Sequence, residues 1–308
     1  MTKNNFKNYI LIAIIFAVLT LILTLPLLFI GIIVTSVLTA LFGYITTKYH
    51  YSFVSFMSAF VFVIYLLFTK NFIHTLNSLI PIILCGVSFG IAYNLKLSEF
   101  KAISIFVFLY TLHLVMNISF FDAFNFENTL SYMTELYKNQ FSETDINALI
   151  SSFAEYVVRY MPSFIIIISI SYSLLSFYLF KKILKRKKMD LSFFKNFSDW
   201  HADKTTSIFY VILGIVTLIY PGQSYFKDAL LNVVVVSSFV FSIFGLSFIS
   251  QIIKQKTFNS LLKKTIMFFI VIYALTTLGL PFSVLSILGV TDGIFDYRKK
   301  LKEPKLPE

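Results

Sequence analysis

The sequence has 308 residues, of which 57% are hydrophobic and only 13% are charged, and its mean hydropathy is +0.81. Because a soluble globular chain carries about 25% charged residues, this composition excludes a soluble domain and indicates an integral membrane protein. The net charge is +11, and the single cysteine, Cys85, excludes an internal disulfide and a cysteine-based metal site.

Apolar runs follow one another from the N-terminus, and most are long enough to cross a hydrocarbon layer of about 30 Å as helices. We expect an all-α, polytopic transmembrane helical bundle. The number of spans is about eight to ten, because three of the runs are short. The candidate spans are about 8–24, 26–47, 51–69, 76–95, 100–120, 160–182, 206–220, 226–253, 261–279 and 281–298.

The candidate spans fall into two groups. Residues 1–182 are expected to form a six-helix transmembrane body, and residues 206–298 a group of C-terminal transmembrane helices. A basic cytoplasmic loop over 183–205 connects them, and a basic cytoplasmic tail over 299–308 follows. Trp200 in the loop is typical of an interfacial anchor where a chain returns to the bilayer.

Basic residues are distributed unequally between the two sides of the predicted membrane. With ten spans and a cytoplasmic N-terminus, all but four of the 26 basic residues face the cytoplasm. This is the positive-inside bias of membrane proteins, and it predicts that both termini are cytoplasmic. The basic clusters are therefore expected to set the topology and to contact the lipid bilayer, and no nucleic-acid partner is expected.

The acidic loop over 121–160 would then face outward. Ser142, with Asp145 three residues later, is typical of a helix N-cap. Apolar residues at helical spacing follow and predict an amphipathic helix that ends at Pro162. This element either lies on the lipid surface or covers the mouth of a cavity.

No enzyme motif stands out in the sequence. There is no glycine-rich phosphate loop, so the chain is not expected to hydrolyse ATP itself. The four histidines are scattered, without the paired spacing of a metal site. We therefore expect no catalytic residues, no metal and no cofactor.

Polar side chains within spans are the remaining candidates, because hydrocarbon makes them costly unless they face protein or water. His113 and Asn117 share one face of the fifth span, and Asp122 follows its outer end. These three are the candidate substrate-binding residues of an outward-opening pocket. Alternatively, they form hydrogen bonds between helices, which contribute about 0.6 kcal/mol each on average.

Small residues in two spans are interpreted as helix-packing positions. Gly86 and Gly90 form a Gly-xxx-Gly pair in the fourth span, and Gly245 lies in the eighth. Such residues allow two helix backbones to approach closely. Asn232, near the start of the eighth span, is a further polar candidate.

The last span ends in charged residues. Asp292 and Asp296 are one helical turn apart and are predicted to face the same way. With Arg298, they are the candidates for a structural ion-pair lock. Alternatively, the two aspartates dock a cytoplasmic partner or take part in proton movement.

The segment from Gly289 to Lys299 has the pattern Gly-x-x-Asp-x-x-x-Asp-aromatic-Arg-Lys, and Ser-Asp-Trp at 198–200, Asn232 and Gly245 precede it. In these residues and their order the chain resembles the YybS-like family of bacterial multi-pass membrane proteins. That family is distantly similar to the substrate-binding subunits of energy-coupling-factor transporters and to MreD-like proteins. The resemblance implies a bacterial cytoplasmic membrane protein.

Two functions follow as hypotheses. The first is a small-molecule transporter or substrate-binding subunit without its own ATPase, which relies on separate ATPase and scaffold subunits. The alternative is a non-transporting membrane scaffold for cell-envelope or division assembly, docked to envelope-assembly proteins. An enclosed, water-accessible cavity would favour transport, whereas dry packing of small residues would favour a scaffold. The substrate and the oligomeric state are not predicted.

Overall fold

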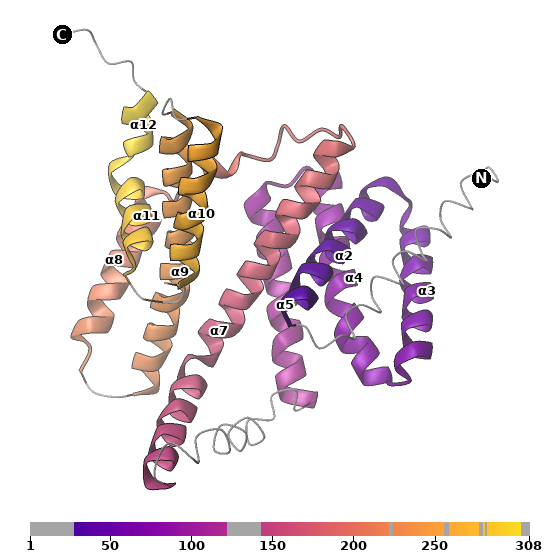
Figure 1. The fold of residues 1–308 in the computed structure, drawn as a ribbon, viewed down its shortest axis with the longest axis horizontal. Helices are drawn as coiled ribbons and strands as arrows, with labels where there is room; N and C mark the ends of the chain where they lie inside the picture. The colour runs from indigo at the N-terminus through magenta and orange to yellow at the C-terminus, as the bar shows by residue number, and fades with distance from the viewer. Residues whose placement is uncertain are drawn as a thin grey trace. The chain divides into compact units, whose positions relative to one another are not determined.

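The structure is a computed structural model. It describes residues 28–121, 143–221, 224–255, 259–276, 280 and 282–302. Within these ranges the chain is all-helical and contains no strand, which confirms the predicted fold class (Figure 1). The expected span over 8–24 and the candidate residue Asp122 lie outside the described residues.

The helices form two compact units. Unit 1 comprises residues 1–126 and 168–194, and unit 2 comprises residues 127–167 and 195–308. The sequence predicts that the first group of helices ends at residue 182. In the structure the N-terminal part of the sixth predicted span is grouped instead with the C-terminal helices.

Unit 1 contains four complete described helices and the C-terminal part of a fifth. Their bounds are α2 Leu28–Lys48, α3 Tyr51–Thr69, α4 Phe72–Asn94, α5 Glu99–Phe121 and, from residue 168 onward, α7 Glu143–Arg186. A short link joins α3 to α4, and caps fix the end of α3 and the start of α4. Lys70 ends α3 in a left-handed conformation (φ 52°), and Asn71 Oδ1 accepts the backbone N–H of His74 at the start of α4.

Aromatic rings fill the interior of unit 1. Phe89 is fully buried and stacks on Phe106 and on Phe180, with ring centroids 4.8 Å and 5.6 Å apart. These rings bring α4, α5 and α7 together. This part of the core is therefore apolar and closely packed.

Glycines set the close approach of α2 and α4. A Cβ atom on Gly86 would lie 2.8 Å from the carbonyl oxygen of Thr39, and one on Gly90 would lie 2.8 Å from that of Gly43. Real Cβ atoms do not approach backbone this closely. Only glycine at these two positions therefore permits the observed helix contact.

Unit 2 contains α8 Lys204–Ile219, α9 Tyr225–Gln255, α10 Ser260–Thr276, α11 Val284–Phe295 and α12 Tyr297–Lys302. A 3₁₀ turn, Phe197–Asp199, precedes α8. Asp203 caps α8 by accepting the N–H of Thr206. The caps fix where the apolar helices begin.

Glycines also define the contact between α9 and α11. A Cβ atom on Gly245 would overlap the backbone carbonyl of Leu285, and one on Gly289 would overlap that of Phe241. The backbones of the two helices are thus in direct contact. The small residue singled out at position 245 lies at this contact, facing a second glycine from the other helix.

The prediction that an amphipathic helix ends at Pro162 is wrong. The helix α7 runs without interruption through this proline. Proline lacks the N–H that would continue the backbone ladder. Within a membrane-spanning helix it is tolerated where neighbouring groups satisfy the freed backbone, and Asn232 provides such a group, as described below.

The prediction of one continuous last helix over 281–298 is also wrong. Helix α11 ends at Phe295, and Asp296 adopts a left-handed conformation (φ 48°) before α12 begins. The N–H of Asp296 still bonds the carbonyl of Asp292. This is a helix C-cap, and it turns the chain between the two aspartates.

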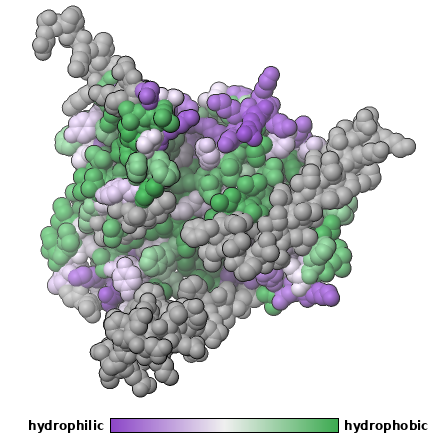
Figure 2. Space-filling view, viewed as in Figure 1, coloured by the Kyte–Doolittle hydropathy of each residue, from purple (hydrophilic) through white to green (hydrophobic). Residues whose placement is uncertain are grey.

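The described helices are suited to a lipid environment. Five have the length and apolar composition to cross a membrane, and three shorter apolar helices accompany them. In Figure 2 the sides of the described helices are mainly hydrophobic, whereas hydrophilic atoms gather near helix ends. This pattern, together with large exposed apolar residues such as Phe108 and Leu218, is that of a multi-pass membrane protein.

Candidate functional site

The structure brings together two of the three predicted substrate-binding residues. On α5, the Asn117 Nδ2 atom donates a hydrogen bond to His113 Nε2 over 2.8 Å. Asn117 is only 9% exposed, and its Oδ1 atom has no hydrogen-bond partner among the described residues. If the amide were turned around, its nitrogen would be unpaired instead. Either way, one polar atom of Asn117 is left without a partner.

Tyrosines extend this polar group within unit 1. The ring of Tyr110 lies 6.2 Å from that of His113 and 4.6 Å from that of Tyr172. The hydroxyl of Tyr172 in turn forms a 2.7 Å hydrogen bond with Thr39 Oγ1 on α2. Ring contacts and hydrogen bonds therefore connect Asn117 on α5 with Thr39 on α2.

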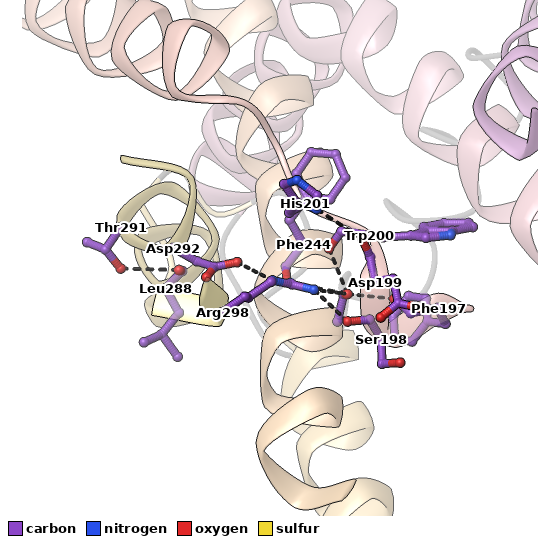
Figure 3. Close-up of polar contacts among 11 residues, drawn as sticks. Phe197, Ser198, Asp199, Trp200, His201, Phe244, Leu288, Thr291, Asp292 and Arg298 are labelled. Atoms are coloured by element: carbon purple, nitrogen blue, oxygen red, sulfur yellow. Dashed lines mark hydrogen bonds and ion pairs between the residues drawn. The ribbon is translucent and has the colours of Figure 1, made fainter. Parts of the chain in front are cut away.

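The predicted ion pair at the end of the chain forms between Asp292 and Arg298. The Arg298 Nε atom lies 2.5 Å from Asp292 Oδ2, and the two side chains are only 7% and 1% exposed (Figure 3). The second carboxylate oxygen, Asp292 Oδ1, has no hydrogen-bond partner among the described residues. A buried pair of this kind is costly to break, because either partner alone would be an uncompensated charge.

Arg298 also binds two other segments of unit 2. Its Nη1 atom donates to the carbonyl of Ser198 over 2.5 Å and to Ser247 Oγ over 3.3 Å, and its Nη2 atom donates to the carbonyl of Phe244 over 3.4 Å. Figure 3 shows the guanidinium between α11 and the segment that holds Ser198. Each guanidinium nitrogen thus has a partner within the protein. Arg298 acts as a clamp between α9, α11 and the turn before α8.

Asp296 lies apart from this clamp. Because the chain turns at this residue, Asp296 is exposed while Asp292 is buried. The prediction that the two aspartates face the same way is therefore wrong. The described structure gives Asp296 no ion pair with Arg298, whose carboxylate partner is Asp292.

Asn232 forms a second polar cluster in unit 2. Its Oδ1 atom accepts the backbone N–H of Ser163 over 3.0 Å and a hydrogen bond from the Ser163 hydroxyl. Its Nδ2 atom donates to the carbonyls of Arg159 and Asp228 over 2.9 Å and 2.8 Å. Arg159 and Asp228 form an ion pair of 3.2 Å beside it. Asn232 therefore satisfies backbone groups of α7 next to Pro162.

A cavity of about 280 Å³ lies beside the Arg298 clamp in unit 2. The residues that line it all have charged or polar side chains, and they are Lys195, Asp199, His201, Gln251, Asp296, Arg298 and Lys299. Gln251 is 6% exposed, and its Oε1 atom has no hydrogen-bond partner among the described residues. The cavity thus offers side chains of both signs of charge, and the buried Gln251 lies at its wall.

Several of these residues were not singled out from the sequence. Ser247 and Gln251 are polar residues near the end of an apolar run. Because polar residues within a span are costly unless they face protein or water, their positions are a sequence signal for a polar site. The roles of the Ser198 and Phe244 carbonyls depend on tertiary contacts and carry no sequence signal. Among the described residues, no cluster of three metal-ligating side chains is present.

The fold and these buried polar groups define a multi-pass, α-helical membrane protein. A family model described as "Predicted membrane protein (DUF2232)" matches residues 11–293. The chain therefore belongs to the DUF2232 family of predicted membrane proteins. No curated protein and no solved structure matches it.

Proposed function

We propose that this protein is the membrane subunit of a small-molecule transport system and that it binds a small polar metabolite in unit 1. The observation that carries the proposal is the unpaired Oδ1 atom of Asn117, buried within an apolar helix beside His113. An unsatisfied polar atom within hydrocarbon is unfavourable, and polar residues inside spans commonly mark substrate pathways. A ligand would supply the missing partner.

The surrounding groups indicate what this ligand would contain. In the orientation that the structure gives, the unpaired atom is the acceptor Asn117 Oδ1, and it requires an N–H or O–H group. Tyr110 and His113 present flat rings to the same region, and such rings favour an apolar or planar part of a ligand. The proposed substrate is therefore a small molecule with a polar donor attached to an apolar or planar body.

The test is to identify small molecules that co-purify with the protein, using mass spectrometry of gently solubilised membranes. The proposal expects one metabolite with the wild-type chain and its loss with His113→Leu and Asn117→Leu. Ser58→Ala is the matched control, because among the described residues the Ser58 hydroxyl bonds only the Val54 carbonyl of its own helix. Unchanged retention of the metabolite in both Leu variants would contradict the proposal.

Energy for transport would come from outside this chain. No phosphate-binding loop occurs in the sequence, and the proposal assigns the chain neither catalysis nor a cofactor. Separate ATPase and scaffold subunits, or an ion gradient, would supply the energy. The resemblance to the YybS-like family, and through it to energy-coupling-factor substrate-binding subunits, supports this division of labour. Recovery of ATPase subunits in the same purification would support it directly.

We place the protein in the bacterial cytoplasmic membrane with both termini in the cytoplasm. This orientation rests on the asymmetric distribution of the 26 lysine and arginine residues. A cysteine-reactive, membrane-impermeant label can test it after a cysteine has been added at either end. We expect the ends to be labelled only after cell lysis. Labelling in intact cells would show that the ends face outward and would contradict the proposed orientation.

A scaffold in envelope or division assembly is the second candidate. The close contact of α2 and α4 at Gly86 and Gly90, and the aromatic core around Phe89, favour it, because these parts of unit 1 are closely packed. The same purification separates the two functions. Envelope-assembly or division proteins without a bound metabolite would favour the scaffold over the transport subunit.

A further inference from the structure

We propose that the cavity beside the Arg298 clamp binds a zwitterionic group that carries a phosphate and a primary ammonium, as in the head group of phosphatidylethanolamine. The proposal concerns unit 2 and is independent of the His113 and Asn117 site. It rests on the charges that line the cavity, on the buried Gln251, whose Oε1 atom has no hydrogen-bond partner among the described residues, and on the exposed apolar side chains beside it.

The charges of the lining balance once Arg298 is set aside. Its guanidinium is already paired with Asp292 and bonded to backbone carbonyls. Lys195 and Lys299 then line the same cavity as Asp199 and Asp296. A simple anion or a simple cation would meet repulsion from one of these pairs, whereas a ligand with both charges would match them.

Gln251 distinguishes a primary ammonium from a quaternary one. Its buried Oε1 atom needs a hydrogen-bond donor. A primary ammonium has three N–H donors, enough for Gln251, Asp199 and Asp296. A quaternary ammonium has none. The phosphate would accept hydrogen bonds from the lysines, which are compact phosphate-binding charges.

The position of the cavity favours a lipid as the source of this group. It lies where the apolar helices α9 and α11 end. Large, apolar and exposed residues are close in sequence to its lining residues Asp296 and Lys299. Phe295 is 53% exposed and Leu301 is 43% exposed. These side chains would contact acyl chains while the charged lining holds the head group. The cavity volume of about 280 Å³ is close to the lower end of small-ligand sites, roughly 300 Å³.

Trp200 provides the readout for the test. It is the only tryptophan in the chain, and it lies between the cavity residues Asp199 and His201 (Figure 3). The purified full-length protein in detergent would be titrated with phosphatidylethanolamine, phosphatidylcholine, phosphatidylglycerol and free phosphoethanolamine. We expect a saturable change in Trp200 fluorescence with phosphatidylethanolamine at about tenfold lower concentration than with phosphatidylcholine or phosphatidylglycerol.

Variants separate the cavity from general detergent or lipid effects. Asp296→Asn and Lys299→Gln alter exposed residues and should weaken the response to phosphatidylethanolamine about tenfold. Lys264→Gln is the matched control, because Lys264 is an exposed lysine of α10 that does not line the cavity. Gln251→Leu should weaken lipid binding without lowering the melting temperature of the lipid-free protein, since it removes an unpaired acceptor.

Each outcome of these titrations either identifies the source of the ligand or contradicts the proposal. If free phosphoethanolamine binds as well as the lipid, the ligand chemistry holds and its source is a soluble metabolite. If only the lipid binds, the source is the bilayer. Equal responses to phosphatidylethanolamine and phosphatidylcholine, or responses unchanged in Asp296→Asn and Lys299→Gln, would overturn the proposal.

Discussion

The side-chain amide of Asn232 on α9 binds the backbone of Ser163 on α7, one residue after Pro162. The same amide donates to the carbonyl of Arg159. In a regular α-helix, the N–H of Ser163 and the carbonyl of Arg159 would be partners of each other. Asn232 therefore binds both members of one step of the α7 backbone ladder, at the place where proline weakens it.

Replacing Asn232 with Leu should destabilise unit 2. The change removes four hydrogen bonds, and at about 0.6 kcal/mol each in membrane proteins the expected loss is roughly 2 kcal/mol. Reversible unfolding in mixed micelles would measure it. Thr217→Val is the control, because within the described ranges the Thr217 hydroxyl bonds only the Leu213 carbonyl of its own helix. Equal stability of the two variants would show that the Asn232 cluster is dispensable.

Breaking the Asp292–Arg298 pair should be costly, and removing both partners should be less so. The single variants Asp292→Leu and Arg298→Met each leave one buried charge and should destabilise by about 3–5 kcal/mol. The double variant should lose less than the sum of the two single changes. A double-mutant cycle in unfolding experiments measures this coupling. Strictly additive losses would contradict a direct pair.

Alanine substitutions should distinguish backbone contacts from side-chain contacts. At Gly245 the added methyl would meet the Leu285 carbonyl, whereas at Gly214 it would meet the far end of the Phe282 ring. A ring can move and a helix backbone cannot. Gly245→Ala should therefore destabilise by about 1–3 kcal/mol and Gly214→Ala by less. Thermal unfolding of the two variants would show which is less stable. A less stable Gly214→Ala variant would contradict the direct backbone contact between α9 and α11.

Acid should weaken the N-cap of α8. The backbone N–H of Thr206 bonds the carboxylate of Asp203 and lowers its pKa below the ordinary value of 3.8. Because the pKa is lowered in the folded state, the stabilisation is fully present above pH 3.8 and is lost as the pH falls through the lowered pKa. The stability of the wild type relative to Asp203→Ala should therefore decline in this acidic range. A constant difference would show that ionisation of Asp203 does not contribute.

Most of the helices follow from hydrophobic runs alone. The run over 51–69 coincides with α3, and the runs over 100–120 and 226–253 differ from α5 and α9 by one or two residues at each end. Such runs are strong signals because a span must satisfy all of its backbone groups as a helix. The two errors, at Pro162 and Asp296, both occur where a cap or a distant side chain decides the outcome.

The polar sites were less predictable than the helices. His113 and Asn117 could be paired from their spacing, because the pair lies on one helix. The sequence also placed Arg298 near two aspartates, but the left-handed turn at Asp296 determines which of them is buried. The cavity joins residues separated by about a hundred positions, such as Lys195 and Lys299. No local pattern in a single sequence encodes that proximity.

The length of α7 has a practical consequence. Its 44 residues correspond to about 66 Å of helix, roughly twice the thickness of a hydrocarbon layer. Its apolar candidate span begins only at Glu155, so the turns before this residue lie outside that span. An antibody or nanobody raised against that stretch would bind the helix outside its apolar span, and its added mass would help particle alignment in electron cryo-microscopy.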